Sequence, residues 1–351
     1  MDEMKELGHL WADTPEATER DLTIARAALV SRIARPERRR PLRFRLAASL
    51  AHARRRYTVR LAAVGVLAVA LTAAIIAAQV GLGGQEAPLG APPASAQSVL
   101  EQAARAAAGQ RDLVPGPGQY VHTKTRVQRM LYTQNPSTEQ LLTALVTADE
   151  ERWEPADPDK PWLNRERAES ATGPVPRWLW DKGVEDTLYE SSCPGRRAYV
   201  RLGAWPTDAA GVRAKLAAQA GTDPLRMWSE LKQLVAESVI RPILSAALFQ
   251  VASDLDGIRL IPDAVDAAGR PGVAVAMDEG KGRRSELIFD RRTYLYLGER
   301  TVNTSDVQVK APGGVYTTPK GTATGTAVLT VELVAALPEV SPKASRLRIP
   351  C

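Results

Sequence analysis

The pattern of apolar and polar positions sets one segment apart from the rest of the chain. Residues 61–80, LAAVGVLAVALTAAIIAAQV, carry no charge and are interrupted only by Gly65, Thr72 and Gln79. At helical rise such a segment is about 30 Å long, which matches the hydrocarbon core of a bilayer. The pattern therefore predicts one transmembrane helix over residues 61–80.

The charges beside this segment predict its orientation. Between Arg32 and Arg60 there are eleven arginines and one acid, Glu37, so the stretch is net +10 in a chain of net charge +6. Cytoplasmic flanks keep arginine and lysine close to the membrane. We therefore expect residues 1–60 in the cytoplasm and residues 81–351 outside. The basic residues that flank the membrane are Arg54, Arg55, Arg56 and Arg60.

A cleaved signal peptide is the alternative to a retained anchor, because Ala94-Ser95-Ala96 resembles a small-residue processing site. Signal peptides have a short basic region and an apolar core of about 7 to 15 residues. Here sixty residues precede the apolar segment, which is twenty residues long. These two lengths favour a retained membrane anchor over a cleaved signal peptide.

The high pI of about 9.4 does not indicate nucleic-acid binding, because the positive charge is concentrated beside the membrane. Only Phe44 and Tyr57 interrupt the arginine-rich stretch as aromatic residues that could stack on bases. Anionic lipid headgroups attract such a stretch without any folded nucleic-acid module. We expect the membrane, and no nucleic acid, as the partner of these arginines.

The cytoplasmic segment 1–60 is too short for a conventional core of its own. Leu22, Ala25, Leu29 and Ile33 recur at helical spacing and form one apolar stripe. A surface helix, or one lying on lipid, and a helix that docks into a groove of a partner protein both remain open.

Residues 81–97 are rich in Gly, Pro and Ala and are expected to be a linker. Residues 98–351 are long enough for a sizeable core. Short apolar runs joined by turns predict an α+β domain, in which a curved antiparallel sheet has inserted helices on one face. On the strand at 120–127, residues 121, 123, 125 and 127 are expected on one face and residues 122, 124 and 126 on the other.

The expected elements of this domain follow from periodicity and from turn residues. Helices are expected at 98–108, from Thr207 or Asp208 to 218, around Trp228 to Val239, and from Pro242 to 255. Strands are expected at 120–127, 147–153, 162–168, 177–180, 197–202, 258–265, 273–277, 286–290, 294–300 and 327–333, with a polar loop before the last.

No catalytic site is expected, and neither a metal nor a cofactor. Ser229-Glu-Leu-Lys232 has the S-x-x-K spacing of acyl-transfer enzymes, but its companion motifs are missing. Of the three histidines, His122 alone lies in the exported part, where a packed or surface role is the expectation. The acidic runs at 149–151 and 157–159 do not match a calcium loop.

Both cysteines, Cys193 and Cys351, are exported on this topology, where a disulfide is permitted. A bond between them and two free thiols both remain open. Six tryptophans are also exported: Trp153, Trp162, Trp178, Trp180, Trp205 and Trp228. Core packing is the main expectation for them, and lining of a concave apolar ligand site is the alternative.

Several segments carry a resemblance to a family of uncharacterised actinobacterial single-pass membrane proteins that are often encoded beside extracytoplasmic-function sigma factors. The segments are ARAAL at 25–29, ERW at 151–153 with Asp157, WPTD at 205–208, AVDAAGRPGVAV at 264–275, and LIFD at 287–290 followed by Thr293-Tyr294 and LGE at 297–299. The resemblance implies an exported half-barrel similar to lipoprotein carriers and lipid-sensing periplasmic regulators, and a tail similar in position to an anti-sigma segment. Zinc-binding anti-sigma tails contain cysteine, and residues 1–60 contain none.

Two functions follow as hypotheses. The first is a membrane-anchored signal-transducing regulator, in which an exported domain senses a ligand or lipid and a cytoplasmic segment restrains a sigma factor or another protein. The second is a membrane-anchored carrier or binding module for an apolar or lipoprotein ligand.

Overall fold

The computed structural model describes residues 95–135, 138–157, 159–191 and 197–350. The expected cytoplasmic tail, with its stripe Leu22, Ala25, Leu29 and Ile33, lies outside the described residues, as does the expected membrane segment 61–80 with its flanking arginines. In the described part of the chain, no helix has the length and apolar character needed to cross a membrane.

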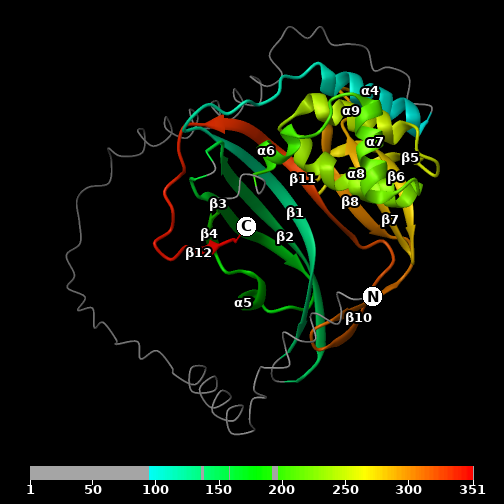
Figure 1. Cartoon of the computed structure of the whole chain (residues 1–351). Helices are drawn as coiled ribbons and strands as arrows, with labels where there is room; N and C mark the ends of the chain where they lie inside the picture. The colour runs from blue at the N-terminus through cyan, green and yellow to red at the C-terminus, as the bar shows by residue number, and fades with distance from the viewer. Residues whose placement is uncertain (1–94, 136–137, 158, 192–196, 351) are drawn as a thin grey trace, which may run out of the picture. The chain divides into compact units, whose positions relative to one another are not determined.

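The described residues form a mixed α+β fold around one large, curved and mostly antiparallel sheet (Figure 1), which confirms the predicted class. The spatial order of its ten strands is β12-β4-β3-β2-β1-β11-β8-β7-β6-β5. The strands are β1 Tyr120–Gln134, β2 Leu141–Pro155, β3 Trp162–Thr172, β4 Val184–Glu190, β5 Arg259–Val265, β6 Pro271–Gly280, β7 Arg283–Phe289, β8 Tyr296–Asn303, β11 Ala323–Val334 and β12 Ser345–Arg348. A separate hairpin joins β9 Val307–Ala311 to β10 Gly314–Thr318.

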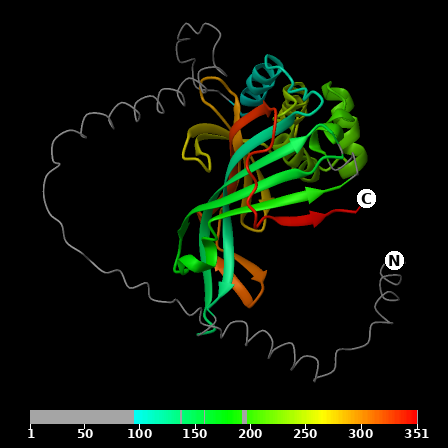
Figure 2. The same ribbon diagram turned by 90° about the vertical axis from the view of Figure 1, so that its left-hand side faces the viewer.

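Helices cover only one part of this sheet, on the face called here the inner face (Figure 2). The helices are α4 Ala96–Ala108, α5 Arg177–Trp180, α6 Ala198–Gly203, α7 Ala209–Ala220, α8 Pro224–Ser238 and α9 Pro242–Ser253. The main core lies between α4, α7, α8 and α9 and strands β6 and β7, and it includes Trp228, Phe249 and Phe289. Because burying this apolar surface is the main source of stability, the β5–β8 half anchors the helix layer.

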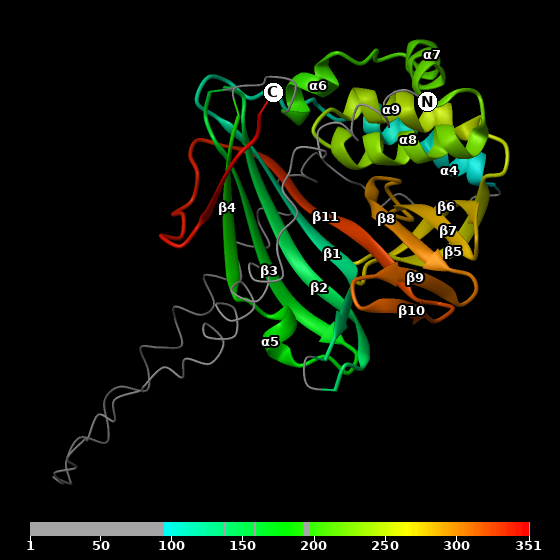
Figure 3. The same cartoon turned by 60° about the horizontal axis from the view of Figure 1, so that its bottom comes forward.

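The other half of the sheet, β1 to β4, extends beyond the helix layer (Figure 3). On its outer face, a smaller core of Tyr120, Trp153, Leu163 and Leu188 is covered by apolar residues of the segment 334–340. The chain then ends in β12, which pairs in parallel with β4. Residues 334–340 therefore cover part of the outer face of this half, whereas the helix layer reaches its inner face at one end, where Val121 joins the main core.

The structure confirms the expected starts of two helices and the expected faces of one strand. Asp208 caps α7 by accepting a hydrogen bond from the Gly211 amide at 2.8 Å. Pro242 opens α9 in the first helical turn, where its missing amide proton costs nothing. Strand β1 pairs on both sides with antiparallel neighbours, so its residues alternate between the two faces as predicted.

Two short segments that were expected to be strands are helices. Residues 177–180 form α5, which starts after Pro176 and is closed by an ion pair between Arg177 and Asp181. Residues 197–202 mostly belong to α6, where a carboxylate oxygen of Glu154 accepts a hydrogen bond from the Tyr199 amide at 3.2 Å. An acid at a helix N-terminus stabilises the helix. This acid comes from β2, so the local sequence did not reveal it.

The expected polar loop before residue 327 contains the β9–β10 hairpin, and β11 is not the last strand because β12 follows it. Strand β4 was not expected either. Strand β12 has four exposed residues, and only Asp186 and Leu188 of β4 are buried. Both are held by pairing with strands distant in sequence, which a local hydrophobic pattern does not encode.

One buried ion pair ties the C-terminal segment to the sheet. Both carboxylate oxygens of Asp186 accept hydrogen bonds from Arg165, at 2.7 and 2.9 Å, and one also accepts from the Ser341 amide at 2.8 Å. The hydrogen bonds from Arg165 are the largest reason why the pKa of Asp186 lies below its usual range. Arg165 also donates to the Glu339 carbonyl at 2.7 Å.

We predict that Asp186→Asn lowers the free energy of unfolding at pH 7 by about 2 kcal/mol, because it removes a charge-assisted pair. A carboxylate with a lowered folded-state pKa stabilises above its unfolded-state pKa, and this stabilisation is lost as the pH falls through the folded-state value. The difference between wild type and variant should therefore shrink below pH 4 in urea unfolding followed by circular dichroism. The exposed control Asp278→Asn should stay within about 0.5 kcal/mol; a pH-independent difference for Asp186→Asn would contradict the prediction.

Candidate functional site

The uncovered inner face of β1 to β4 is organised as rows of side chains that run across the strands. Strand register places Thr125, Glu150, Glu166 and Glu185 in one row. The next row is Thr123, Arg152, Asn164, Thr187 and Ser345. In a third row Val121 lies opposite Glu154, and Trp162 lies opposite Tyr189. Polar groups from four strands are thus placed on one surface.

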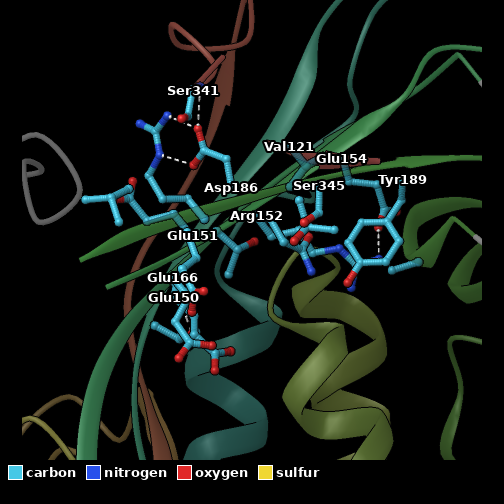
Figure 4. Close-up of a pocket in the computed structure, with 18 of the residues that line it drawn as sticks. Val121, Glu150, Glu151, Arg152, Glu154, Glu166, Asp186, Tyr189, Ser341 and Ser345 are labelled. Atoms are coloured by element: carbon cyan, nitrogen blue, oxygen red, sulfur yellow. Dashed lines mark hydrogen bonds and ion pairs between the residues drawn. The ribbon is translucent and has the colours of Figure 1, made fainter. Parts of the chain in front are cut away.

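This surface lies along a groove with a volume of about 730 Å³, whose lining also includes Glu151, Arg165, Asp186, Ser341 and Lys343. Its wall is formed by Ala236 and Glu237 of α8, by Val239 and Ile240 after α8, and by Ala198 of α6. Figure 4 shows Glu150 and Glu166 side by side at one end, and Glu154, Ser345 and Tyr189 at the other. The volume is in the range typical of small-molecule sites, and the mixed lining offers carboxylates, hydroxyls and a few apolar contacts.

Glu150 and Glu166 face each other directly across two strands, and Arg129 forms ion pairs with both. Burial is the largest reason why the pKa of Glu150 is raised, and the neighbouring Glu166 raises it further, while Arg129 lowers it. Glu185 lies opposite Glu166 on the other side. Like charges placed directly opposite each other destabilise a sheet, so this row has an electrostatic cost.

The far end of the groove is closed by the stacked side chains of Arg197, Trp162 and Tyr189. The guanidinium of Arg197 lies 4.3 Å from the centre of the Trp162 ring, and Trp162 in turn stacks on Tyr189 at 5.1 Å. Burial lowers the pKa of Arg197, while the charge of Glu154 raises it. Glu154 also binds Arg152 at 2.7 Å. The arginine, the aromatic rings and the carboxylate hold α6 against the end of the sheet.

None of the six tryptophans is among the residues that line this groove. Trp205 and Trp228 belong to the main core. Trp153 lies on the outer face, stacked on His122 at 4.5 Å. Trp162 is covered by Arg197, and Trp178 of α5 is 59% exposed at the end of the sheet where β4 begins.

The residues considered for catalysis are engaged elsewhere. Nζ of Lys232 binds Glu279 at 3.0 Å, and Ser229 is half-buried on α8. His122 lies on the outer face, and its ring nitrogens contact Glu151 at 2.9 Å and Glu332 at 3.0 Å. Within the described ranges, no group of three or more His, Cys, Asp or Glu residues is arranged to hold a metal ion. Cys193 and Cys351 lie outside the described residues, so a bond between them stays a prediction.

A scan against protein-family models finds no match, and a search of curated proteins finds none. Among solved structures, the chain is similar to the complex of Pseudomonas aeruginosa MucA and MucB, at 18% identity and a TM-score of 0.20 over 70% of this chain. The chain spans 59% of the length of that matched chain. It is also similar to a putative outer membrane lipoprotein-sorting protein domain from Vibrio parahaemolyticus, at 11% identity and a TM-score of 0.18, over 70% of this chain and 95% of that one. At these scores the likeness carries no functional argument.

Proposed function

We propose that the chain is a single-pass, membrane-anchored regulator of the cell envelope. Residues 98–351 form its extracytoplasmic sensing domain, residues 61–80 its membrane helix, and residues 1–60 a cytoplasmic segment that restrains a sigma factor or another protein. The proposal includes no catalytic step, metal or cofactor. The membrane part rests on the uncharged segment and its flanking arginines.

The observation that carries the proposal is the groove on the inner face of β1 to β4. A sheet in a compact domain normally has its inner face covered by helices or by a second sheet. Here part of that face lies along a groove of about 730 Å³, which is lined by polar side chains from several strands. Such a concave, largely preformed surface supports ligand recognition.

The cytoplasmic half of the proposal is tested by purifying the tagged full chain from membranes and identifying the proteins that accompany it. We expect a sigma factor with the wild type, and its loss in Leu22→Asp/Leu29→Asp, because a charged pair on the apolar stripe prevents helix docking. The matched control is Ala27→Asp/Ser31→Asp, which places the same charges on the opposite face of the expected helix. Equal recovery from both variants, or no sigma factor with the wild type, would contradict the proposal.

Orientation is tested separately with a tag placed after Cys351. In cells whose cytoplasmic membrane is intact and whose outer layers let a protease through, the protease should reach and cleave the tag. If the protease cleaves the tag only after the membrane is broken, the proposed topology is refuted.

A carrier or binding module in the envelope is the second candidate. It is favoured by the apolar groove residues Val239, Ile240 and Tyr189, and opposed by the carboxylates beside them. Co-purifying lipid, together with normal function after deletion of residues 1–30, would select the carrier over the regulator.

A further inference from the structure

The groove floor has a negative charge that the described residues balance only in part. Glu150, Glu166 and Glu185 lie next to one another across three strands. Arg129 pairs with the first two, and among the described residues Glu185 has no ion-pair partner within 4.0 Å. One guanidinium thus faces two carboxylates and Glu185 lacks a cation in the described part of the chain, and opposing like charges cost stability unless a further cation is supplied.

Four cations also line the groove, Arg152, Arg165, Lys182 and Lys343, against seven acidic residues, so the lining remains negative. Arg152 is paired with the buried Glu154, and Nζ of Lys182 donates to the Trp178 carbonyl at 2.8 Å. The wall adds another acid, Glu237, which is paired with Arg201. Asn164, in the middle of the floor, has a buried side-chain oxygen without a hydrogen-bond partner. The surface therefore offers acceptors and negative charge to an occupant that brings donors and positive charge.

The dimensions of the carboxylate row fit an extended chain. Neighbouring strands are about 4.8 Å apart, so the row from Glu150 to Glu185 crosses about 10 Å. In an extended peptide, alternate side chains point to the same side about 7 Å apart. Two basic side chains separated by one residue therefore fit over the row, and the residue between them points away from it.

The margins of the groove add apolar and aromatic contacts. Val239 and Ile240 form part of the wall, and Tyr189 lies at the end of the floor. The exposed Trp178 of α5 lies just before Lys182 and Val184, which line the groove at the start of β4. An exposed indole face attracts ammonium and guanidinium groups. A fatty acyl chain would instead bury carboxylates without any compensating partner, which is costly.

We propose that the groove binds a polypeptide segment in an extended conformation, with lysine or arginine at alternate positions and apolar residues between them. The proposal rests on the proposed function, because it takes the groove to be the recognition surface, and it defines the class of ligand. The basic side chains lie over the row from Glu150 to Glu185, and the apolar ones contact Val239 and Ile240.

The test measures binding of a fluorescent octapeptide, (Lys-Val)₄, to the purified full chain by anisotropy. The variant Glu166→Gln/Glu185→Gln removes two carboxylates and should raise the dissociation constant about tenfold, because each lost charge contact contributes a few-fold. Binding to the wild type should weaken between 50 and 500 mM salt, since partly exposed charge contacts are screened. The analogue (Glu-Val)₄ should not bind measurably.

The matched control is Asp256→Asn/Asp263→Asn, which makes the same change in net charge at exposed positions far from the groove. Its affinity for (Lys-Val)₄ should equal that of the wild type. Both variants keep the arginine-rich stretch 32–60. Any competition between this stretch and the labelled peptide for the groove is therefore the same in each variant. The thermal midpoint of Glu166→Gln/Glu185→Gln should be unchanged or higher, because the substitution removes repulsion within the row.

Three outcomes would overturn the proposal: equal affinity of wild type and groove variant, equal binding of the acidic analogue, or binding of oleate by a chain that binds neither peptide. The last result would leave the groove as a ligand site and refute only the ligand class. Loss of the sigma-factor interaction in the purification experiment concerns the cytoplasmic segment, so the two failures are distinguishable.

Discussion

Replacing Trp228 by alanine is expected to lower the free energy of unfolding by about 3–5 kcal/mol. Trp228 is fully buried between α8 and the sheet, and its indole nitrogen donates to Oγ of Ser285 on β7 at 2.8 Å. The substitution leaves a cavity and removes the donor to the Ser285 hydroxyl. Urea unfolding of the full chain, followed by circular dichroism, measures the effect.

Two further variants separate the causes. Trp228→Phe keeps most of the buried volume but leaves Ser285 without its donor, so we expect a loss of about 1–3 kcal/mol. Trp178→Ala removes a tryptophan that is 59% exposed and should change stability by less than about 0.5 kcal/mol. A similar loss for Trp178→Ala and Trp228→Ala would show that the helix layer does not depend on the buried indole.

Replacing Glu286 by glutamine is expected to cost about 3–5 kcal/mol, because it leaves two cations without their carboxylate. Glu286 is fully buried on the outer face of β7. It accepts hydrogen bonds from Arg284 at 2.7 Å and from Arg300 of β8 at 2.6 Å. The measurement is again urea unfolding at pH 7.

The triple variant Arg284→Met/Glu286→Leu/Arg300→Met tests the reason for this loss. Removing the whole buried cluster should restore stability to near the wild-type value, since the desolvation cost disappears with the charges. The exposed pair Asp263–Arg291 provides the control, and Asp263→Asn should have little effect. If the triple variant were as unstable as Glu286→Gln, packing and not charge would explain the loss.

The sequence predicts the elements that are stabilised by local patterns. Asp208 and Pro242 mark helix starts because capping is a local interaction. Alternation along 120–127 gives the two faces of β1, since the side-chain period of a strand is fixed. Helix α6 and strand β12 are missed because their stabilising partners, Glu154 and β4, are distant in sequence.

The carboxylate row of the groove could be predicted only in part. Alternation places Glu150 and Glu166 each on one face of its own strand, but only strand register puts them opposite each other. Glu185 lies on β4, for which the sequence shows no clear strand pattern. A search for acidic residues at matching faces of successive strands would find the first two and miss the third.

The final strand has a consequence for how the molecule behaves at high concentration. Strand β12 occupies the edge of β4 with four residues, two of which are Arg346 and Arg348. Without it, the free hydrogen-bonding groups of β4 would be a template for pairing with a second chain, and charged residues on an outermost strand discourage such pairing. Strand β12 therefore protects the edge of β4 from pairing with a second chain.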